Sequence, residues 1–415
     1  MTLQQNKDRF DIIVIGGGPA GMMAAGRAAE RGAKVLLIEK TYRLGSKLLL
    51  TGGGHCNITN NAQMRDMIAA FGKNGKFLYR AFTVFSNKDL IDFFSSRGVK
   101  MRIEPDGRVL PLKGGASAVL AVLRTYLKEN SVTILHNTAA KTVRNGVALS
   151  DGRTLQAKKI IIATGGKSYP TTGSPGDGYK MARPCGPTIE KIGPGLSALR
   201  SSALFIKDLQ GLTLKDISIS VIIDGRKELE EKGDILFTHF GVSGPIVLNF
   251  SGAIIDALAD KSKVDISLNL RPGHSRQEFE GILQNEFVAF GPKTVSQYFK
   301  KALPASLSSV FIKLCRLAAD KKCGTVSRQE RKMIAECFTD LRIPIAGPRP
   351  IEEATITRGG VSLKEIDPQT MESRKVGGLY FCGEILDLAG FTGGYNLQEA
   401  FSTGYLAGEA SAEDK

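Results

Sequence analysis

The chain has 415 residues, of which 42% are hydrophobic and 23% are charged. This length allows two or three domains that each bury a core, and the composition excludes a disordered or fibrous protein. The formal net charge is +15, and residues 291–342 hold eleven Lys and Arg against four Asp and Glu. This segment is either a surface for anions or nucleic acid or a solvated helical face, and the absence of an RNA-binding motif favours the solvated face.

The sequence indicates no leader, membrane span or metal site. Residues 1–9 are too polar for the apolar core of a signal peptide, and the apolar stretch 243–259 is too short for a span and carries Asn249 and Asp256. The six cysteines are far apart and include no C-x-x-C pair, which argues against a zinc site and against a dithiol redox pair. We therefore expect a cytoplasmic protein with reduced thiols and no bound metal.

The N-terminal segment has the pattern of a β-α-β unit. An apolar run at 11–15 predicts a buried parallel strand, small apolar residues at 21–31 predict a closely packed helix, and 34–38 predicts a second strand that ends at Glu39. A glycine-rich turn connects the first strand to the helix and consists of Gly16, Gly17, Gly18, Pro19, Ala20 and Gly21. This arrangement is typical of a Rossmann dinucleotide-binding half.

The residue types in this turn suit a pyrophosphate. Gly16 permits the sharp turn, Gly18 lets the backbone approach the pyrophosphate, and Gly21 lets the helix pack on the strand. The helix N-terminus offers free N–H groups and a partial positive charge. Glu39 follows the second strand, where its carboxylate can accept both ribose hydroxyls. A turn without a ligand is the alternative, and the strand, helix and acid in register favour dinucleotide binding.

The same periodicities predict the next elements, which are helices at 88–97 and 116–129 and strands at 132–135 and 159–163. Between the last two, residues 141–156 alternate in polarity and contain the turn signals Asn145-Gly146 and Asp151-Gly152. These signals predict a small antiparallel meander.

The character of the sequence changes after about residue 190. Gly, Asp and Pro separate short apolar runs, which indicate an antiparallel sheet or barrel with strands at 199–206, 217–223, 235–238 and 264–270. Residues 275–338 are predicted to be helical, with breaks at Gly291-Pro292 and at Pro304. A strand at 378–382 and a helix at 396–410 then resemble the first strand and helix in kind.

These patterns predict an α/β fold in which a Rossmann-type domain is interrupted by a β-rich insert that carries a small helical subdomain. The expected limits are 1–192 and 346–415 for the Rossmann domain, 193–274 and 339–345 for the insert, and 275–338 for the helical subdomain.

Two further strand ends decide between FAD and NAD. The apolar strands at 159–163 and 378–382 each run into a glycine-containing turn, made of Thr164, Gly165 and Gly166 in the first and of Gly383 and Glu384 in the second. Both turns resemble segments with which glutathione-reductase-type flavoproteins hold FAD, and in such proteins the acid, here Glu384, binds the ribityl chain. Each turn alone could simply end a strand. All three turns together favour FAD.

The start of the last helix offers a further contact to the flavin. Gly394 precedes this helix, and its first backbone N–H groups include those of Asn396 and Leu397. Directed at the N1–C2=O edge of the flavin, they would stabilise the negative charge of its reduced form. A glycine-rich helix cap without a ligand is the alternative.

Five strings of residues carry a wider resemblance, at 45–60, 106–111, 163–179, 236–245 and 383–398. They resemble the BaiN-like and YhiN-like bacterial flavoproteins, NAD(P)/FAD-dependent oxidoreductases that include aminoacetone-oxidase-type enzymes. The resemblance implies a discontinuous FAD domain of the glutathione-reductase type, a β-rich insert over the flavin and a small helical piece. It also implies FAD contacts by Gly17 and Glu39 and by Lys40, Lys47, Thr51, Gly52 and, through its backbone, Ala140.

Two histidines in these strings are candidates for catalysis. His239 is the first candidate because it ends a predicted insert strand, and His55 is the second. A lone histidine is more often a structural residue than a catalytic one. No second G-x-G-x-x-G follows an apolar strand in the middle of the chain. NADH or NADPH, if either is the electron donor, would therefore have to bind directly over the flavin.

The leading hypothesis is an FAD-dependent oxidoreductase that acts on a small molecule by hydride transfer at flavin N5, through C=C reduction or amine oxidation. The basic helices leave open an RNA- or nucleotide-modifying flavoprotein, and a non-enzymatic flavin sensor is the third alternative. The substrate, the electron donor and the oligomeric state stay open.

Overall fold

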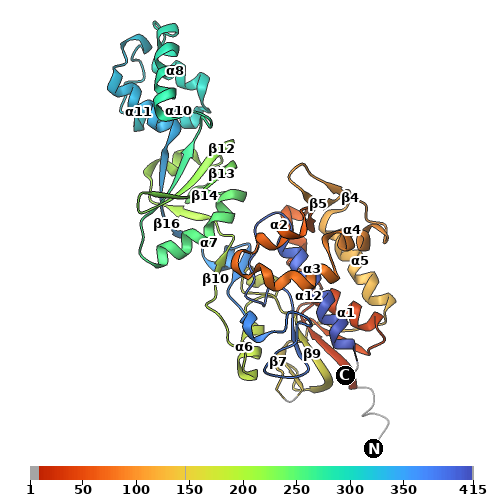
Figure 1. Ribbon diagram of the computed structural model, residues 1–415. Coiled ribbons are helices and arrows are strands. Elements are labelled where there is room, and N and C mark those ends of the chain that lie inside the picture. The colour runs from red at the N-terminus through yellow and green to blue at the C-terminus, as the bar shows by residue number, and fades with distance from the viewer. Residues whose placement is uncertain (1–8, 145, 414–415) are drawn as a thin grey trace, which may run out of the picture. The chain divides into compact units, whose positions relative to one another are not determined.

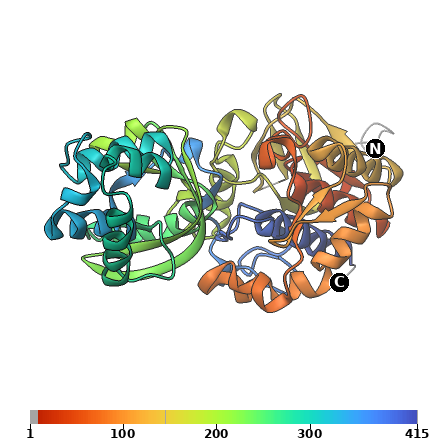
Figure 2. The same cartoon turned by 90° about the horizontal axis from the view of Figure 1, so that it is seen from above.

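The computed structural model describes residues 9–144 and 146–413. The chain packs into two compact units, the first made of Met1–Gly195 with Ile351–Lys415 and the second of Leu196–Pro350 (Figures 1 and 2). The first unit is α/β and the second contains a closed β-barrel, as the sequence predicts for the fold class. The finer domain limits expected from the sequence stay a prediction.

A seven-stranded sheet forms the centre of the first unit. Its parallel strands are β1 (Arg9–Ile15), β2 (Val35–Ile38), β6 (Thr133–Leu135), β18 (Leu379–Phe381) and β9 (Thr154–Ile162), which pairs in parallel over residues 156–162. β1 lies between β2 and β9, β6 pairs with the far side of β2, and β18 pairs with β9. All four residues of β2 are buried, as expected for a parallel strand covered on both faces.

The other edge of this sheet is antiparallel. β7 (Ala140–Thr142), β8 (Val147–Leu149) and the first half of β9 form the predicted meander. Of its two expected turns, Asp151-Gly152 lies in the described chain, where Gly152 has a φ of +88°. The other expected turn includes Asn145, which lies outside the described residues.

Two long helices from opposite ends of the sequence pack closely on one another. They are α1 (Pro19–Glu30) and α12 (Tyr395–Ala412), and the C-terminal helix, drawn in blue, lies among the red and orange N-terminal segments (Figures 1 and 2). A Cβ atom on Gly404 would lie 2.4 Å from the carbonyl oxygen of Ala20, and one on Gly408 would lie 2.5 Å from that of Ala24. Glycine at both positions therefore permits the close approach.

The remaining elements of the first unit surround the sheet. The predicted helices at 88–97 and 116–129 correspond to α4 (Asn87–Ser95) and α5 (Gly115–Glu129). The shorter elements are α2 (Met64–Ala69), α3 (Tyr79–Val84), α6 (Asp177–Ala182), the small sheet of β3 (Thr59–Asn60), β5 (Arg108–Pro111) and β4 (Met101–Ile103), and the pair β10 (Gly193–Gly195) with β17 (Ile356–Arg358).

The second unit contains the closed barrel. Its strand order is β11-β14-β13-β12-β15-β16, with bounds Leu199–Ser201, Gly241–Ser243, Arg226–Phe237, Thr213–Ile223, Val264–Asn269 and Leu341–Pro348 respectively. α7 (Pro245–Ala259) packs against these strands. Closure of the sheet removes exposed strand edges.

Two strand predictions in this unit are wrong. The strand expected at 199–206 ends at Ser201, and a 3₁₀ helix at Leu204–Leu209 follows, because Ile206 and Leu209 are buried at a three-residue spacing. The strand expected at 235–238 is only the end of β13, which begins at Arg226. The first nine residues of this strand are nearly all charged and mostly exposed, so they lack the apolar alternation that predicts a strand.

The predicted helical segment contains α8 (Arg276–Ala289), α9 (Val295–Ala302), α10 (Ala305–Leu314) and α11 (Arg328–Thr339). Gly291-Pro292 and Pro304 fall between helices, as expected. Figure 1 shows α8, α10 and α11 grouped together. The Sγ atoms of Cys315 and Cys337 lie 3.5 Å apart, because packing of the ends of α10 and α11 brings together residues that are 22 positions apart. Whether they act as a redox pair, which the sequence argues against, stays a prediction.

Candidate functional site

Four predicted cofactor-binding segments meet at one edge of the first unit's sheet. Gly16 directly follows β1, Glu39 follows β2, Thr164 lies just beyond β9, and Gly383 lies just beyond β18. These strands are parallel neighbours, so their carboxyl ends lie along one edge. In open α/β sheets this edge is where ligands bind.

The first turn has the geometry of an anion-binding loop. α1 begins after Gly18, and no side chain caps its first turn. A Cβ atom on Gly18 would meet no atom within 4 Å, whereas one on Gly16 would lie 2.4 Å from the Ala163 carbonyl oxygen and one on Gly21 would lie 1.8 Å from that of Gly16. The outer two glycines therefore serve packing, and Gly18 borders open space at the helix N-terminus. Ala20 lies in the first turn of this helix.

The carboxylate of Glu39 is held in place by backbone and side-chain donors. Its Oε2 accepts a hydrogen bond from the Gly17 N–H at 2.8 Å, and its Oε1 accepts from the N–H and the hydroxyl of Thr41, each at 2.8 Å. Carboxylate oxygens have further acceptor capacity, so the group can still accept ribose hydroxyls. The segment before Ala140 lies alongside, because the Thr138 N–H donates to the Glu39 carbonyl oxygen.

A cluster of polar side chains surrounds Glu384. The Nζ atom of Lys47 lies 2.8 Å from Oε2 of Glu384 and 2.6 Å from Oγ of Ser168. Oε1 of Glu384 also accepts from the Ser168 hydroxyl at 3.0 Å and from the Thr357 N–H at 2.8 Å. Two residues assigned to FAD from the sequence, Lys47 and Glu384, thus lie together and form an ion pair with about a fifth of each side chain exposed.

Glycines permit this cluster to form. A Cβ atom on Gly166 would lie 2.2 Å from the Thr357 hydroxyl and 2.8 Å from Glu384 Oε1. Gly165 has a φ of +72° and packs on the Ser174 hydroxyl, which donates to the Thr164 carbonyl oxygen. The hydroxyl of Thr164 itself is buried and is one of the few side-chain atoms without a partner in the described chain. It lies against Gly178, where an added Cβ atom would come within 2.0 Å of it.

The other residues assigned to FAD from the family resemblance lie in the same unit but do not contact Glu384. Lys40 pairs with Asp177, with Nζ and Oδ2 2.6 Å apart. Thr51 donates to the Leu48 carbonyl oxygen at 2.6 Å, and Gly52 has a φ of +56°. A Cβ atom on Gly52 would come no closer than 3.8 Å to another residue, so this segment is open on that side.

The glycine before α12 is explained by packing against β3. A Cβ atom on Gly394 would lie 2.3 Å from the carbonyl oxygen of Thr59. The side chain of Asn396 accepts from the Gly390 N–H and donates to the Gly390 and Phe391 carbonyl oxygens. α12 has no side-chain cap, and Leu397 is half-buried in its first turn. The start of α12 can therefore bind a ligand through its backbone N–H groups, because the Asn396 side chain is already hydrogen-bonded within the chain.

The two histidines lie in different units. His55 is exposed and directly follows the 3₁₀ segment Leu48–Gly54 of the first unit. His239 is also exposed, but it belongs to the second unit and lies in the tight turn between β13 and β14. The sequence placed it at the end of a strand, whereas β13 ends at Phe237. A catalytic role for either histidine stays a prediction.

Sequence reasoning missed two residues at this edge. Thr357 is fully buried, and its hydroxyl accepts from the N–H groups of Lys167 at 2.6 Å and Ser168 at 3.1 Å. Glu399 is 3% exposed on α12, and burial, followed by the negative charge of Glu384, raises its pKa to about 8. Thr357 and Glu399 lie outside any glycine-rich turn, so only the folded chain brings them to Glu384.

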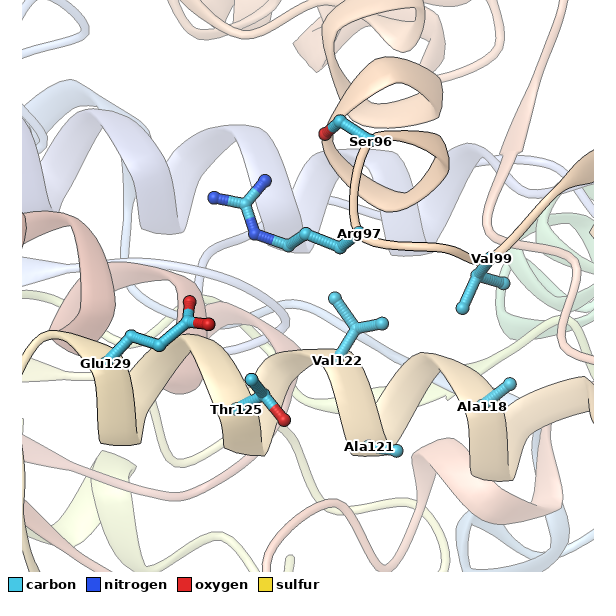
Figure 3. A pocket seen from close by; sticks show the side chains of 8 residues that line it. All are labelled: Ser96, Arg97, Val99, Ala118, Ala121, Val122, Thr125 and Glu129. Atoms are coloured by element: carbon cyan, nitrogen blue, oxygen red, sulfur yellow. The ribbon is translucent and has the colours of Figure 1, made fainter.

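The groove in Figure 3 lies elsewhere in the first unit. It is lined by the residues that directly follow α4 and by one side of α5, and none of the predicted site residues lines it. Its Arg97 donates to the Phe93 carbonyl oxygen at 3.0 Å and stacks on the Phe93 ring. Within residues 9–144 and 146–413, no group of His, Cys, Asp and Glu has the arrangement of a metal site. No helix in that part of the chain is both long and apolar enough to span a membrane.

The site's residues fit a dinucleotide. The uncapped start of α1 beside open space suits a diphosphate, and the fixed carboxylate of Glu39 suits a ribose diol. No second glycine-rich turn of this kind supplies another dinucleotide site in the sequence.

Known proteins resemble this chain over almost its full length. The 3-dehydro-bile acid delta(4,6)-reductase of Clostridium scindens is 28% identical, over 97% of this chain and 99% of the relative. The ribosomal RNA dihydrouridine synthase of Escherichia coli is 29% identical, over 97% of this chain and 98% of the relative. A solved 3-ketosteroid delta1-dehydrogenase from Sterolibacterium denitrificans shares the fold, with a TM-score of 0.55 at 14% identity over 98% of this chain and 99% of the other.

The model of the HI0933-like protein Rossmann domain family matches residues 10–410. This match covers both units and confirms the resemblance drawn from the sequence strings. The chain therefore belongs to the HI0933-like Rossmann family, which includes the BaiN-like flavoproteins, and it is a flavin-dependent oxidoreductase with an FAD-binding fold.

Proposed function

We propose that this protein uses FAD to saturate a C=C bond conjugated to a carbonyl group. The observation that carries the proposal is a feature shared by two near-full-length relatives with different substrates. A delta(4,6)-reductase and a dihydrouridine synthase are both named for the saturation of a C=C bond. Amine oxidation, the other reaction considered from the sequence, has no such support.

The turns after β1 and β2 would hold the adenosine diphosphate end of FAD. The backbone of Gly16, Gly17, Gly18 and Ala20 would hold the diphosphate at the start of α1, and Glu39 would accept hydrogen bonds from the adenosine ribose. The Ala140 backbone would border the adenine, since residues just before it are hydrogen-bonded to the Glu39–Thr41 segment. Lys40, which the Asp177 carboxylate holds, would lie beside this end of the cofactor.

The other end of FAD would lie between the Glu384 cluster and α12. Glu384, held by Lys47, Ser168 and Thr357, would accept hydrogen bonds from the ribityl hydroxyls. The remaining contacts would come from loop backbones and helix-start N–H groups, namely those of Thr51, Gly52, Thr164, Gly165, Gly166, Gly383, Gly394, Asn396 and Leu397.

When bound and reduced, FAD supplies a hydride for one carbon of the double bond. The chain must then deliver a proton to the neighbouring carbon and polarise the carbonyl group. His55 is our first candidate for the proton donor within the first unit, because it is exposed next to the open Gly52–Gly54 turn. His239 remains the candidate from the second unit.

The first test is flavin content followed by turnover. Protein freed of flavin should take up one equivalent of FAD and should bind FMN, which lacks the adenosine that Glu39 would hold, more weakly. With FAD restored and reduced, it should convert an enone or a uridine-containing RNA to a product heavier by two hydrogens. Failure to take up FAD refutes the cofactor assignment, and uptake without saturation of any conjugated C=C bond refutes the reaction.

RNA is a second candidate substrate, and one surface feature favours it. Lys293 and Lys301 are exposed, and the Nζ atom of each lies 5.1 Å from the centre of the half-buried Phe290 ring. Lys300 is exposed beside Lys301. An aromatic ring flanked by lysine charges suits a nucleobase and its phosphates.

Salt dependence separates an RNA substrate from a small molecule. If RNA binds through this surface, K293A/K301A should weaken RNA binding and make it less sensitive to salt. The slope of the logarithm of the binding constant against the logarithm of the salt concentration should become shallower by about 0.7 for each phosphate that is no longer neutralised. The matched control is K261A/K263A, which removes two exposed lysines near the barrel strands. Equal effects of the two double variants would contradict the RNA surface and leave the small-molecule substrate.

A further inference from the structure

Two cysteines of the second unit form a thiol pair that the sequence does not reveal. The Cys315 thiol donates a hydrogen bond to Sγ of Cys337, with the two sulfur atoms 3.5 Å apart. Cys315 directly follows α10, and Cys337 lies in the last turn of α11. A sulfur–sulfur bond is about 2 Å long, so the two sulfur atoms must move about 1.5 Å closer for a disulfide to form.

The two thiols have different surroundings. Cys315 is fully buried, whereas Cys337 is only partly buried. The hydrogen bond from Cys315 lowers the pKa of the Cys337 thiol, and the same hydrogen bond, with burial, raises the pKa of Cys315. Cys337 is thus the member that an oxidant reaches and the one that more readily carries a thiolate.

We infer that Cys315 and Cys337 form a reversible redox modification site, in which a peroxide oxidises the two thiols to a disulfide that joins α10 to α11. The Cys337 thiolate attacks one oxygen atom of hydrogen peroxide and breaks the O–O bond. The attacked oxygen stays on sulfur as a sulfenic acid, and the other oxygen leaves as hydroxide, which is protonated to water. Cys315 then attacks this sulfur, and the second oxygen leaves as water. The two thiols together lose two electrons and two hydrogens, and the peroxide becomes two waters.

The other cysteines lack this geometry in the described chain, which contains all six. Cys56 and Cys382 are fully buried in the first unit, and burial raises the pKa of both thiols. Cys323 is the best internal comparison because it belongs to the same helical segment, yet it is 1% exposed and burial raises its pKa.

The disulfide would change the stability of the helical segment. It would close a loop between positions 315 and 337 that contains the 3₁₀ turn Cys323–Thr325 and most of α11. Such a crosslink restricts the unfolded chain and stabilises the folded one. Since α10 and α11 both belong to the second unit's core, oxidation should raise the unfolding temperature of that unit.

The test is controlled oxidation of the purified, FAD-loaded full chain with hydrogen peroxide. We expect the thiol count under denaturing conditions to fall from six to four and dithiothreitol to restore it. After alkylation and trypsin digestion, residues 314–316 should be linked to residues 333–342. The thermal unfolding midpoint should rise by several degrees in the oxidised protein.

Variants assign the effect to this pair. C337S replaces the partly buried thiol and should abolish the crosslink and the thermal shift, whereas C323S should retain both. C315S should lose the crosslink and accumulate sulfenic acid at Cys337. If C315S does not fold, peptide mapping of the oxidised protein without substitutions still shows whether Cys315 and Cys337 are linked. A crosslink through Cys323, or oxidation of Cys337 to sulfinic acid without a crosslink, would overturn the inference.

Discussion

The Nζ atom of Lys47 lies 2.8 Å from Oε2 of Glu384, which connects the segment after β2 to the turn after β18. These residues are 337 positions apart, and both ends of the chain are needed to bring them together. The ion pair fixes the carboxylate that we propose binds the ribityl chain.

Replacing Lys47 with Met should weaken FAD binding about tenfold or more, because Glu384 would lose its cationic partner and turn toward water. Breaking a partly buried ion pair costs about 1–3 kcal/mol, less than a fully buried one, because each side chain is about a fifth exposed. Fluorescence titration of flavin-free protein with FAD measures the change. The double variant K47M/E384Q should recover part of the loss, and strictly additive losses would contradict direct coupling of the two residues.

Thr357 should act as a positioning residue for the same cluster. T357V keeps its shape but removes the hydroxyl that accepts the Lys167 and Ser168 N–H groups. This leaves the buried Ser168 donor unpaired at about 1–3 kcal/mol, and the part-buried Lys167 donor unpaired at a smaller cost. We expect lower stability in urea unfolding and weaker FAD binding. T357S retains the hydroxyl and should behave like the unchanged protein. If T357V and T357S are equally stable, the hydroxyl does not hold this turn.

Glu39 should determine binding of the adenosine half of FAD. E39A removes the acceptor of the Gly17 N–H and of two Thr41 donors, so the dissociation constant for FAD should rise at least tenfold, or about 1.4 kcal/mol. Binding of FMN should change little. E228A, at an exposed position of the second unit, is the matched control. Equal loss of FMN and FAD binding in E39A would instead indicate general misfolding of the turn.

Glu399 should make the stability of the flavin-free protein depend on pH. Its pKa is raised from 4.5 to about 8, by burial and then by the charge of Glu384. Between these values the folded state holds a proton that the unfolded state releases, so this contribution to the free energy of unfolding is complete below pH 4.5 and is lost as pH rises toward 8. The slope approaches about 1.4 kcal/mol per pH unit.

E399Q removes this titration and should flatten the decline in stability between pH 5 and pH 8, as measured by urea unfolding across a pH series. E409Q is a useful control on the same helix, because Glu409 pairs with Arg27 near the surface. An unchanged pH profile in E399Q would show that Glu399 is ionised in the folded protein.

The parallel strands and their turns could be predicted from the sequence because each is a local pattern. β1, α1 and β2 follow the apolar runs around Gly16–Gly21, and both long terminal helices follow their spacing. Most of β13 is not predictable in this way, because its charged, exposed residues show no apolar alternation and only pairing with the neighbouring strands β12 and β14 defines it.

Side-chain partners could not be predicted in the same way. Thr357 and Ser168 reach Glu384 only after β17 and the turn beyond β9 pack beside one another. At Gly394 the close approach of the Thr59 backbone, which no local pattern reveals, requires glycine independently of any ligand. The proximity of Cys315 and Cys337 likewise depends on helix packing and not on sequence spacing.

Anaerobic stopped-flow reaction of the reduced, FAD-loaded protein with candidate acceptors tests the central claim most directly. Reduction should be attempted with NADH, with NADPH and with dithionite, and the acceptors should include a steroid enone, unmodified ribosomal RNA and an imine. We predict that a conjugated C=C compound reoxidises the flavin and gains two hydrogens, as seen by mass spectrometry. Reoxidation by the imine, with every C=C acceptor recovered unchanged, would contradict the proposed reaction.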